Sequence, residues 1–184
     1  MHVLAISGSL RLDSHNTNLL RSAAPLAPPD ASVVLWDGLK DVPPFDEDDE
    51  ASEPAAVAQM RAAVAEADAI LFATPEYNSS IPGQLKNAID WLSRPKATAA
   101  LRNKPVVVVG ASTGSFGAVW AQADLRKVLA ASGARVIEGD VAVGNAPQRF
   151  DEDGILNDAD LREQLAEVLE TLVEAARVRT AVAA

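Results

Sequence analysis

The chain has 184 residues, and it contains no cysteine, only two histidines and few aromatic side chains. Without cysteine, disulfides, thiol redox chemistry and thiolate metal sites are excluded. The two histidines, His2 and His15, both lie near the start of the chain, so imidazole is scarce elsewhere. We therefore expect no metal site.

The sequence also lacks a long apolar run and an excess of basic residues. A membrane-spanning helix needs about 18 or more consecutive apolar residues, and no segment approaches that length. The first five residues, 1–5, lack the basic region that opens a signal peptide. A net charge of −10 argues against nucleic acid or an anionic membrane as a partner. We expect a cytoplasmic protein with neither kind of partner.

The length is typical of one domain, and we assign 1–184 to a single unit. Short apolar runs of strand length alternate with longer helical patterns along the chain. The expected strands are Met1–Ser7, Ser32–Trp36, Ala69–Thr74, Pro105–Ala111 and Ala134–Val143. The expected helices lie near 16–26, 54–67, 82–94, 117–132 and 158–178, and a frayed end follows at 180–184. Such alternation predicts an α/β fold, a five-stranded parallel sheet of order 2-1-3-4-5 in three flavodoxin-like layers with helices on both faces.

Polar residues crowd the loop after the first strand. They supply hydroxyl and amide donors, a cationic fork at Arg11, and a glycine, Gly8, that lets the backbone approach a ligand closely. A helix that starts near Asn16 directs its free N–H groups and positive dipole end to the same place. These features predict a phosphate site at Ser9, Arg11, Ser14, Asn16 and Thr17.

Two more polar loops follow the third and fourth strands. The first is Pro75-Glu76-Tyr77-Asn78-Ser79-Ser80-Ile81-Pro82-Gly83, and the second contains Ser112, Thr113 and Gly114. In a parallel sheet the carboxyl ends of the strands share one edge, where ligands bind. Three converging loops favour a ligand over ordinary connections, with a phosphate at one end and a flat ring at the other.

The third loop also matches the Gly-x-Ser-x-Gly pattern of serine hydrolases, at 110–114. That mechanism needs an acid and then a histidine later in the chain. No histidine follows His15. We treat the match as chance.

The three loops together resemble the NADPH-dependent FMN reductase family, a flavodoxin-like group that includes quinone, chromate and azo-dye reductases. The resemblance is carried by Gly8-Ser9-Leu10-Arg11-x-x-Ser14-x-Asn16, by Pro75-Glu76-Tyr77-Asn78-x-Ser80-x-Pro82-Gly83-x-Leu85-Lys86-Asn87-Ala88-Ile89-Asp90-Trp91, and by Ser112-Thr113-Gly114-x-Phe116-Gly117. It covers the chain from the first strand to the fourth helix.

The resemblance implies noncovalent FMN, with its phosphate on Ser9, Arg11, Ser14, Asn16 and Thr17. The isoalloxazine ring is then expected against Pro75, Glu76, Tyr77 and Asn78, with Ser112, Thr113 and Gly114 along the far side. Tyr77 and Asn78 are the residues expected to affect rate. Members of the family assemble as homodimers or homotetramers, which makes Trp91 either an interface residue or a core aromatic.

The implied activity is ping-pong hydride transfer from NADPH or NADH to FMN, and then on to a quinone, flavin, azo compound or metal oxyanion such as chromate. Two rival functions remain, a non-enzymatic electron carrier and a ligand-sensing module of the same fold. The sequence leaves the acceptor open. Arg94, Lys96 and Arg102 are candidates to recognise a 2′-phosphate, although ordinary surface charges explain them better.

Overall fold

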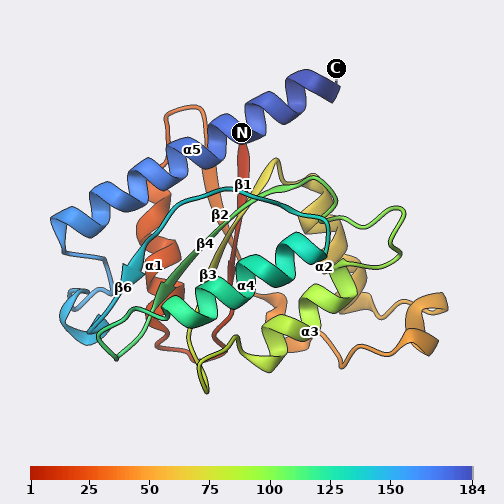
Figure 1. Cartoon of the computed structure of the whole chain (residues 1–184), viewed down its shortest axis with the longest axis horizontal. Coiled ribbons are helices and arrows are strands. Elements are labelled where there is room, and N and C mark those ends of the chain that lie inside the picture. Colours follow the sequence, from red (N-terminus) through yellow and green to blue (C-terminus); the bar gives the residue numbers. More distant parts are fainter. Residues whose placement is uncertain (184) are drawn as a thin grey trace.

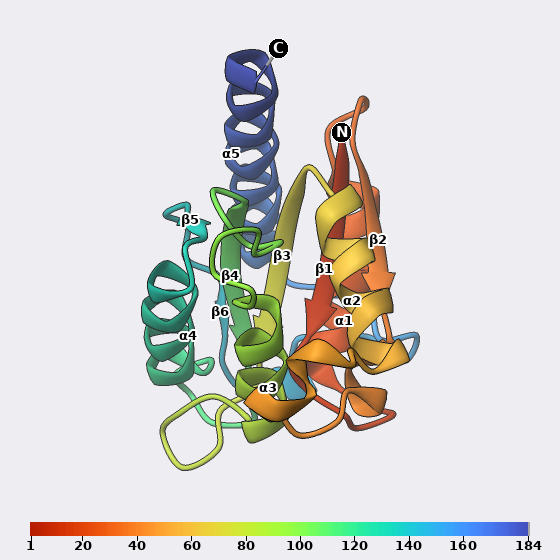
Figure 2. The same cartoon turned by 90° about the vertical axis from the view of Figure 1, so that its right-hand side faces the viewer.

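The sheet orders its strands as the sequence predicts, in a computed structural model that describes residues 1–183. The strands are β1 (His2–Ser7), β2 (Ser32–Trp36), β3 (Ala69–Thr74), β4 (Pro105–Ala111), β5 (Arg135–Val136) and β6 (Ala142–Val143). All the pairings are parallel and follow the order β2-β1-β3-β4-β5, with β6 also paired to β4. Figure 2 shows the strands running toward one edge, where the connecting loops gather.

Helices cover both faces of the sheet (Figure 1). They are α1 (His15–Ala23), α2 (Ala55–Glu66), α3 (Gly83–Leu92), α4 (Val119–Ala131) and α5 (Ala159–Ala183). Because successive strand side chains point to opposite faces, Val107 and Val109 pack with α1 and α5, whereas Val106 and Val108 pack with α2, α3 and α4. The result is the predicted three-layer architecture with a core on each side of the sheet.

The prediction of one continuous strand at 134–143 is wrong, because the structure has two short strands there, β5 and β6. Both pieces lie along β4, and 137–141 bulges between them. The guanidinium of Arg126 fills the break, donating at 3.1 Å to the carbonyl of Val108 and at 2.9 Å to that of Gly139. The side chain thus replaces ladder hydrogen bonds that the charged, glycine-containing segment does not make.

The last helix is longer than the sequence predicts. α5 continues through Ala183, where a frayed end was expected from residue 180, and Ala184 lies outside the described residues. Thr180 donates from Oγ1 to the carbonyl of Ala176 at 3.1 Å, and Arg177 forms a two-pronged ion pair with Asp30 at 2.7 and 2.8 Å. This pair ties the end of α5 to the turn before β2. No helix within residues 1–183 is long and apolar enough to cross a membrane.

The acidic segment 46–53 folds as a 3-10 helix, Glu47–Ala51, between two arginines. Arg94, after α3, lies 3.7 Å from Glu47 and 3.6 Å from Glu50, and its guanidinium is stacked over Phe45. Arg61 on α2 pairs with Glu53. The segment is therefore fastened to the helix layer. Trp91 packs edge-on against Phe45 beneath it, fully buried within a single chain, which makes it a core aromatic.

Candidate active site

The three predicted loops meet in one small cavity of about 100 Å³ at the carboxyl edge of the sheet. Nine of the twelve predicted site residues line it: Ser9, Arg11, Ser14, Asn16, Pro75, Glu76, Tyr77, Ser112 and Thr113. Of the remaining three, Thr17 lies in the first turn of α1, and Asn78 and Gly114 lie in the second and third loops. Segments about one hundred residues apart in sequence therefore build a single site, as the parallel topology requires.

The first loop leads directly into α1. Ser14 is the N-cap, and its Oγ accepts a hydrogen bond from the backbone N–H of Thr17 at 3.3 Å. The first N–H groups of a helix have no partner within it, so they are available to an anion. Thr17 turns inward, because its hydroxyl donates to the Oγ of Ser7 at 3.0 Å. The exposed Arg11 forms no ion pair with another residue of 1–183.

Asn16 joins the first loop to the third. Its side-chain NH₂ donates to the carbonyl of Ala111, and its side-chain carbonyl accepts from the N–H of the same residue, both at 2.9 Å. The amide is buried. This clamp fixes the start of α1 against the end of β4, and it was not foreseen from the sequence.

The second loop is a tight turn. The backbone N–H of Tyr77 donates to the carbonyl of Ser80 at 3.0 Å, and the N–H of Ser80 returns a bond at 3.1 Å. Asn78 and Ser79, between them, both have positive φ angles, 52° and 59°. Two positive φ angles define the type I′ turn, which is strained for residues other than glycine. The turn holds Tyr77 half-exposed over the cavity, and the N–H groups of Asn78 and Ser79 bond to no other residue within the described chain.

Glu76 has a role that sequence reasoning missed. One oxygen of its carboxylate accepts hydrogen bonds from the N–H groups of Trp120 and Ala121, each at 3.1 Å, in the first turn of α4. Negative charge is favourable at a helix N-terminus. A few residues on, Ser80 donates to the carboxylate of Asp124 at 2.8 Å. α4 thus holds the second loop at both ends.

The third loop is supported by the chain after β6. The N–H of Asn145 donates to the carbonyl of Gly114 at 2.9 Å, and the N–H of Ala146 donates to that of Ser112 at 3.0 Å. A Cβ on Gly114 would meet nothing closer than the Oγ of Ser112, at 3.6 Å. The loop surface at Gly114 is therefore open to a flat ligand.

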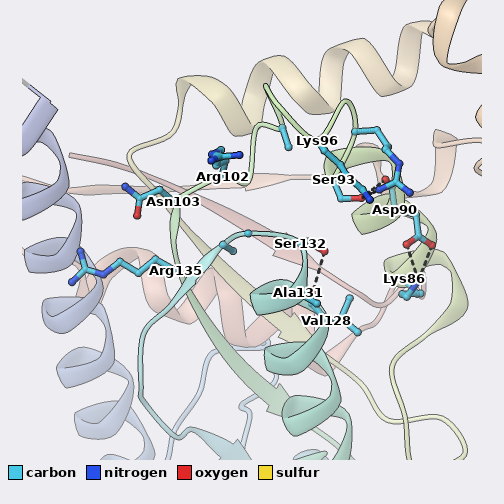
Figure 3. Close-up of a pocket in the computed structure, with 14 residues that line it drawn as sticks. Lys86, Asp90, Ser93, Lys96, Arg102, Asn103, Val128, Ala131, Ser132 and Arg135 are labelled. Atoms are coloured by element: carbon cyan, nitrogen blue, oxygen red, sulfur yellow. Dashed lines mark hydrogen bonds and ion pairs between the residues drawn. The ribbon is translucent and has the colours of Figure 1, made fainter.

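A second, larger cavity of about 850 Å³ lies elsewhere, at the amino ends of β4 and β5 (Figure 3). It contains none of the residues predicted to bind FMN, although the three candidates for a 2′-phosphate site, Arg94, Lys96 and Arg102, line it. Five basic side chains line it: Lys86, Arg94, Lys96, Arg102 and Arg135. Its size does not make it the site, because in open parallel sheets ligands bind at the carboxyl ends of the strands.

Comparisons with known proteins agree with this geometry. The family model for NADPH-dependent FMN reductase matches residues 1–148. The chain belongs to this family. The predicted family, the enzyme class (oxidoreductase) and the cofactors FMN and NAD(P)H are thereby confirmed.

Individual members of the family are similar to this protein over most of its length. An NAD(P)H-dependent FMN reductase of Pseudomonas aeruginosa is 42% identical over 172 residues, which cover 92% of each chain. A quinone reductase of Pseudomonas putida is 38% identical over 158 residues, covering 85% of this chain and 84% of the relative. Among solved structures, the flavoenzyme NAD(P)H:(acceptor) oxidoreductase FerB of Paracoccus denitrificans superposes with a TM-score of 0.84 at 31% identity, covering 96% of this chain and 97% of that one.

The residues at the carboxyl edge suit a phosphorylated flavin. Arg11 and the two serine hydroxyls Ser9 and Ser14 face one cavity at the positive end of α1. Arg11 forms no ion pair with another described residue, so its guanidinium is available to a phosphate. On the ring side, the open surface at Gly114 and the unbonded N–H groups of the second loop suit a flat heterocycle with carbonyl oxygens.

Proposed function

We propose that the three-loop cavity holds the phosphate end of FMN, and that the enzyme reduces quinones and related acceptors with NAD(P)H. The convergence of nine predicted residues from three loops on one cavity supports this proposal most directly. The cavity itself is small, which matches a phosphate rather than a whole flavin. The ring then lies outward, over the second and third loops, with one face open to reactants.

When bound, FMN supplies the hydride chemistry, accepting a hydride from NAD(P)H and releasing electrons to the acceptor. The protein's contribution is binding and orientation. Arg11 and Ser9 donate to the phosphate, and the half-exposed Tyr77 packs against the ring. The unbonded N–H groups of Asn78 and Ser79 offer donors to the ring's pyrimidine edge, where negative charge develops on reduction.

We propose ping-pong turnover, because one open face must serve both the nicotinamide and the acceptor. The donor leaves before the acceptor enters. Such a face accepts many flat or anionic oxidants, and quinones, free flavins, azo compounds and chromate are the classes to test. We also propose a cytoplasmic location, which the use of NAD(P)H and the lack of cysteine support.

We also propose a homodimer or homotetramer. Four exposed apolar side chains lie beside the cavity: Tyr77, Phe116, Val119 and Trp120. The rings of Phe116 and Trp120 pack edge-on, with their centroids 5.2 Å apart. Clustered exposed aromatics of this kind favour burial against another surface. Light scattering of Trp120→Ser beside the parent chain tests the assembly, since a smaller particle is expected and an unchanged mass contradicts it.

The decisive experiment starts from purified protein incubated with FMN. We expect a yellow protein that NADPH bleaches without oxygen and that a quinone restores to yellow. A yellow protein that NADPH fails to bleach would make it an electron carrier. A protein that stays colourless after refolding with excess FMN contradicts the proposal altogether.

Arg11→Ala tests the phosphate site itself. Loss of a charge-assisted hydrogen bond costs about 1.5–3 kcal/mol, so the Kd for FMN should rise roughly 10- to 100-fold. Arg21→Ala is the matched control, because Arg21 is an exposed arginine later on α1 that bonds to Asn18. If both variants retain FMN equally well, Arg11 does not bind the phosphate.

A further inference from the structure

His15 stands between two predicted phosphate residues, Ser14 and Asn16, yet nothing in its sequence context marks it as functional. The imidazole opens α1 and lines the same cavity as Arg11. It stacks on Phe150, with ring centroids 5.6 Å apart and planes 19° from parallel. Phe150 is itself buried in the segment after β6. The ring is therefore held in place by packing, on the wall of the proposed cofactor site.

The Nδ1 of His15 is the one buried side-chain nitrogen or oxygen without a hydrogen-bond partner in the described chain. A buried polar group left unpaired costs about 1–3 kcal/mol, so such a group asks for an explanation. Helix N-capping does not supply one, because Ser14 already caps α1. No contact within residues 1–183 sets which ring nitrogen carries the proton.

The charge that acts on His15 from within the cavity is that of Arg11. Arg11 faces it from the first loop, and its charge, together with the larger effect of burial, lowers the pKa of His15 below the usual value of 6.5. From the second loop, Tyr77 and Glu76 line the cavity, and one carboxylate oxygen of Glu76 accepts from two N–H groups of α4.

No carboxylate among the described residues is a cause of the shift in the pKa of His15. In the segment that carries Phe150, Arg149 is paired with Asp158, and the carboxylate of Asp151 accepts from the N–H groups of Asp153 and Ile155. The first turn of α1 contains no acidic residue, and the third loop contributes only Ser112 and Thr113. Arg11 and His15 thus face one cavity in which Glu76 is the one acid among the described lining residues, and that carboxylate already accepts two N–H groups of α4.

We propose that His15 is a further anchor for the FMN phosphate, neutral in the free protein and protonated in the complex. This inference rests on the proposed function. As the dianion binds, the imidazole takes up one proton from solvent and donates a charge-assisted hydrogen bond to a phosphate oxygen. The negative charge of the phosphate offsets both the burial and the repulsion from Arg11, so the pKa of His15 rises on binding.

This coupling makes FMN affinity depend on pH. Below the pKa that His15 has in the free protein, the imidazole is charged before and after binding. Its contribution to FMN affinity is then at its maximum. As pH rises through the pKa that His15 has in the FMN complex, the imidazole loses its proton and its contribution to FMN affinity disappears. FMN retention by this site is therefore stronger in mild acid than in mild alkali, relative to a chain without the imidazole.

The test compares the parent chain with His15→Phe and His15→Gln by FMN fluorescence titration between pH 5.5 and 8.5. His15→Phe keeps an aromatic ring on Phe150, and His15→Gln keeps a polar side chain, so folding is checked by thermal unfolding of both. The phosphate of FMN titrates in the same range in all three proteins, and it cancels in the ratio of Kd values.

We expect the Kd of each variant to exceed that of the parent roughly tenfold near pH 6, and by less than about twofold at pH 8.5. Calorimetry in two buffers of different ionisation enthalpy should show more proton uptake by the parent than by His15→Phe near pH 6.5. A ratio that does not vary with pH, together with equal proton uptake, overturns the role of His15. If FMN still binds and Arg11→Ala still weakens it, the proposed function survives that result; if the parent chain binds no FMN, the proposed function itself fails.

Discussion

The side-chain amide of Asn16 forms a two-way hydrogen-bonded clamp with the backbone of Ala111, across 95 residues of sequence. One bond runs in each direction, each 2.9 Å long, and both are buried. The clamp joins the start of α1, which follows the first loop, to the end of β4, which precedes the third loop. Any ligand that spans the two loops therefore meets a prearranged surface.

Asn16→Ala should lower the free energy of unfolding by about 2–4 kcal/mol, because it leaves a buried N–H and a buried C=O without partners. Urea denaturation monitored by circular dichroism measures this change. Gln148→Ala serves as control, since Gln148 is exposed and forms no side-chain hydrogen bond within the described residues. A loss for Asn16→Ala no larger than for the control contradicts the importance of the clamp.

Glu76→Ala should cost about 1 kcal/mol of stability, the usual effect of removing a helix cap, and should also weaken FMN binding because the second loop loses its attachment to α4. Glu76→Gln is the matched variant. It keeps an acceptor oxygen but loses the charge that favours the helix N-terminus, so it should lose less than Glu76→Ala. Unfolding and FMN titrations on both variants check this order, and equal losses would show that hydrogen bonding adds nothing beyond charge.

Because Lys104 is buried, the free energy of unfolding should depend on pH. Its ammonium is buried, donates to the carbonyls of Ala65 and Ala67 at the end of α2, and has its pKa lowered to about 8, first by burial and then by the charge of Arg179. In the unfolded chain the pKa is the ordinary 10.5. Between these values the unfolded state binds the extra proton, so stability should rise with pH.

Below about pH 8 both states are protonated, and the cost of burying the charge is fully present. Between pH 7.5 and 10, the free energy of unfolding of the wild-type chain should rise by about 2 kcal/mol relative to that of Lys104→Met. Subtracting the Met variant removes the titration of other groups. A difference that stays flat, or that falls as pH rises, contradicts the assigned shift.

Gly117→Ala should destabilise the protein by more than about 2 kcal/mol and disturb the third loop. The φ of Gly117 is 60°, and a Cβ there would lie 2.3 Å from the carbonyl carbon of Ala142, which cannot move without breaking β6. Gly83→Ala is the control, because nothing lies within 4 Å of its Cβ position at the start of α3. That change should be neutral or stabilising by up to about 1 kcal/mol, and a Gly117→Ala chain of unchanged stability would contradict the close approach.

Sequence reasoning predicted the five α-helices and the order of the sheet, because both depend on local periodicity and on parallel connections. It failed at β5 and β6, where the break depends on Arg126 arriving from α4 to satisfy Val108. The loop after β1 was predicted as a phosphate site because short donors and a cation next to a helix start are visible in sequence, and the phosphate itself stays a prediction. The hydrogen bonds of Glu76 to α4 and the stacking of His15 were missed, because the partners, Trp120 and Phe150, are distant in the chain.

By itself, the sequence determined the alternation of buried strands and amphipathic helices, and it placed three polar loops after the first, third and fourth strands. Local composition is enough for that, since each element needs only its own pattern. Tertiary structure alone decided which atoms remain free. The side chains of three site residues already form hydrogen bonds to groups that are distant in sequence, namely Asn16, Glu76 and Ser80. By contrast, Arg11 and His15 line the cavity and form no ion pair with an acid of the described chain. Whether a polar group is already satisfied depends on neighbours that only folding brings within hydrogen-bonding distance.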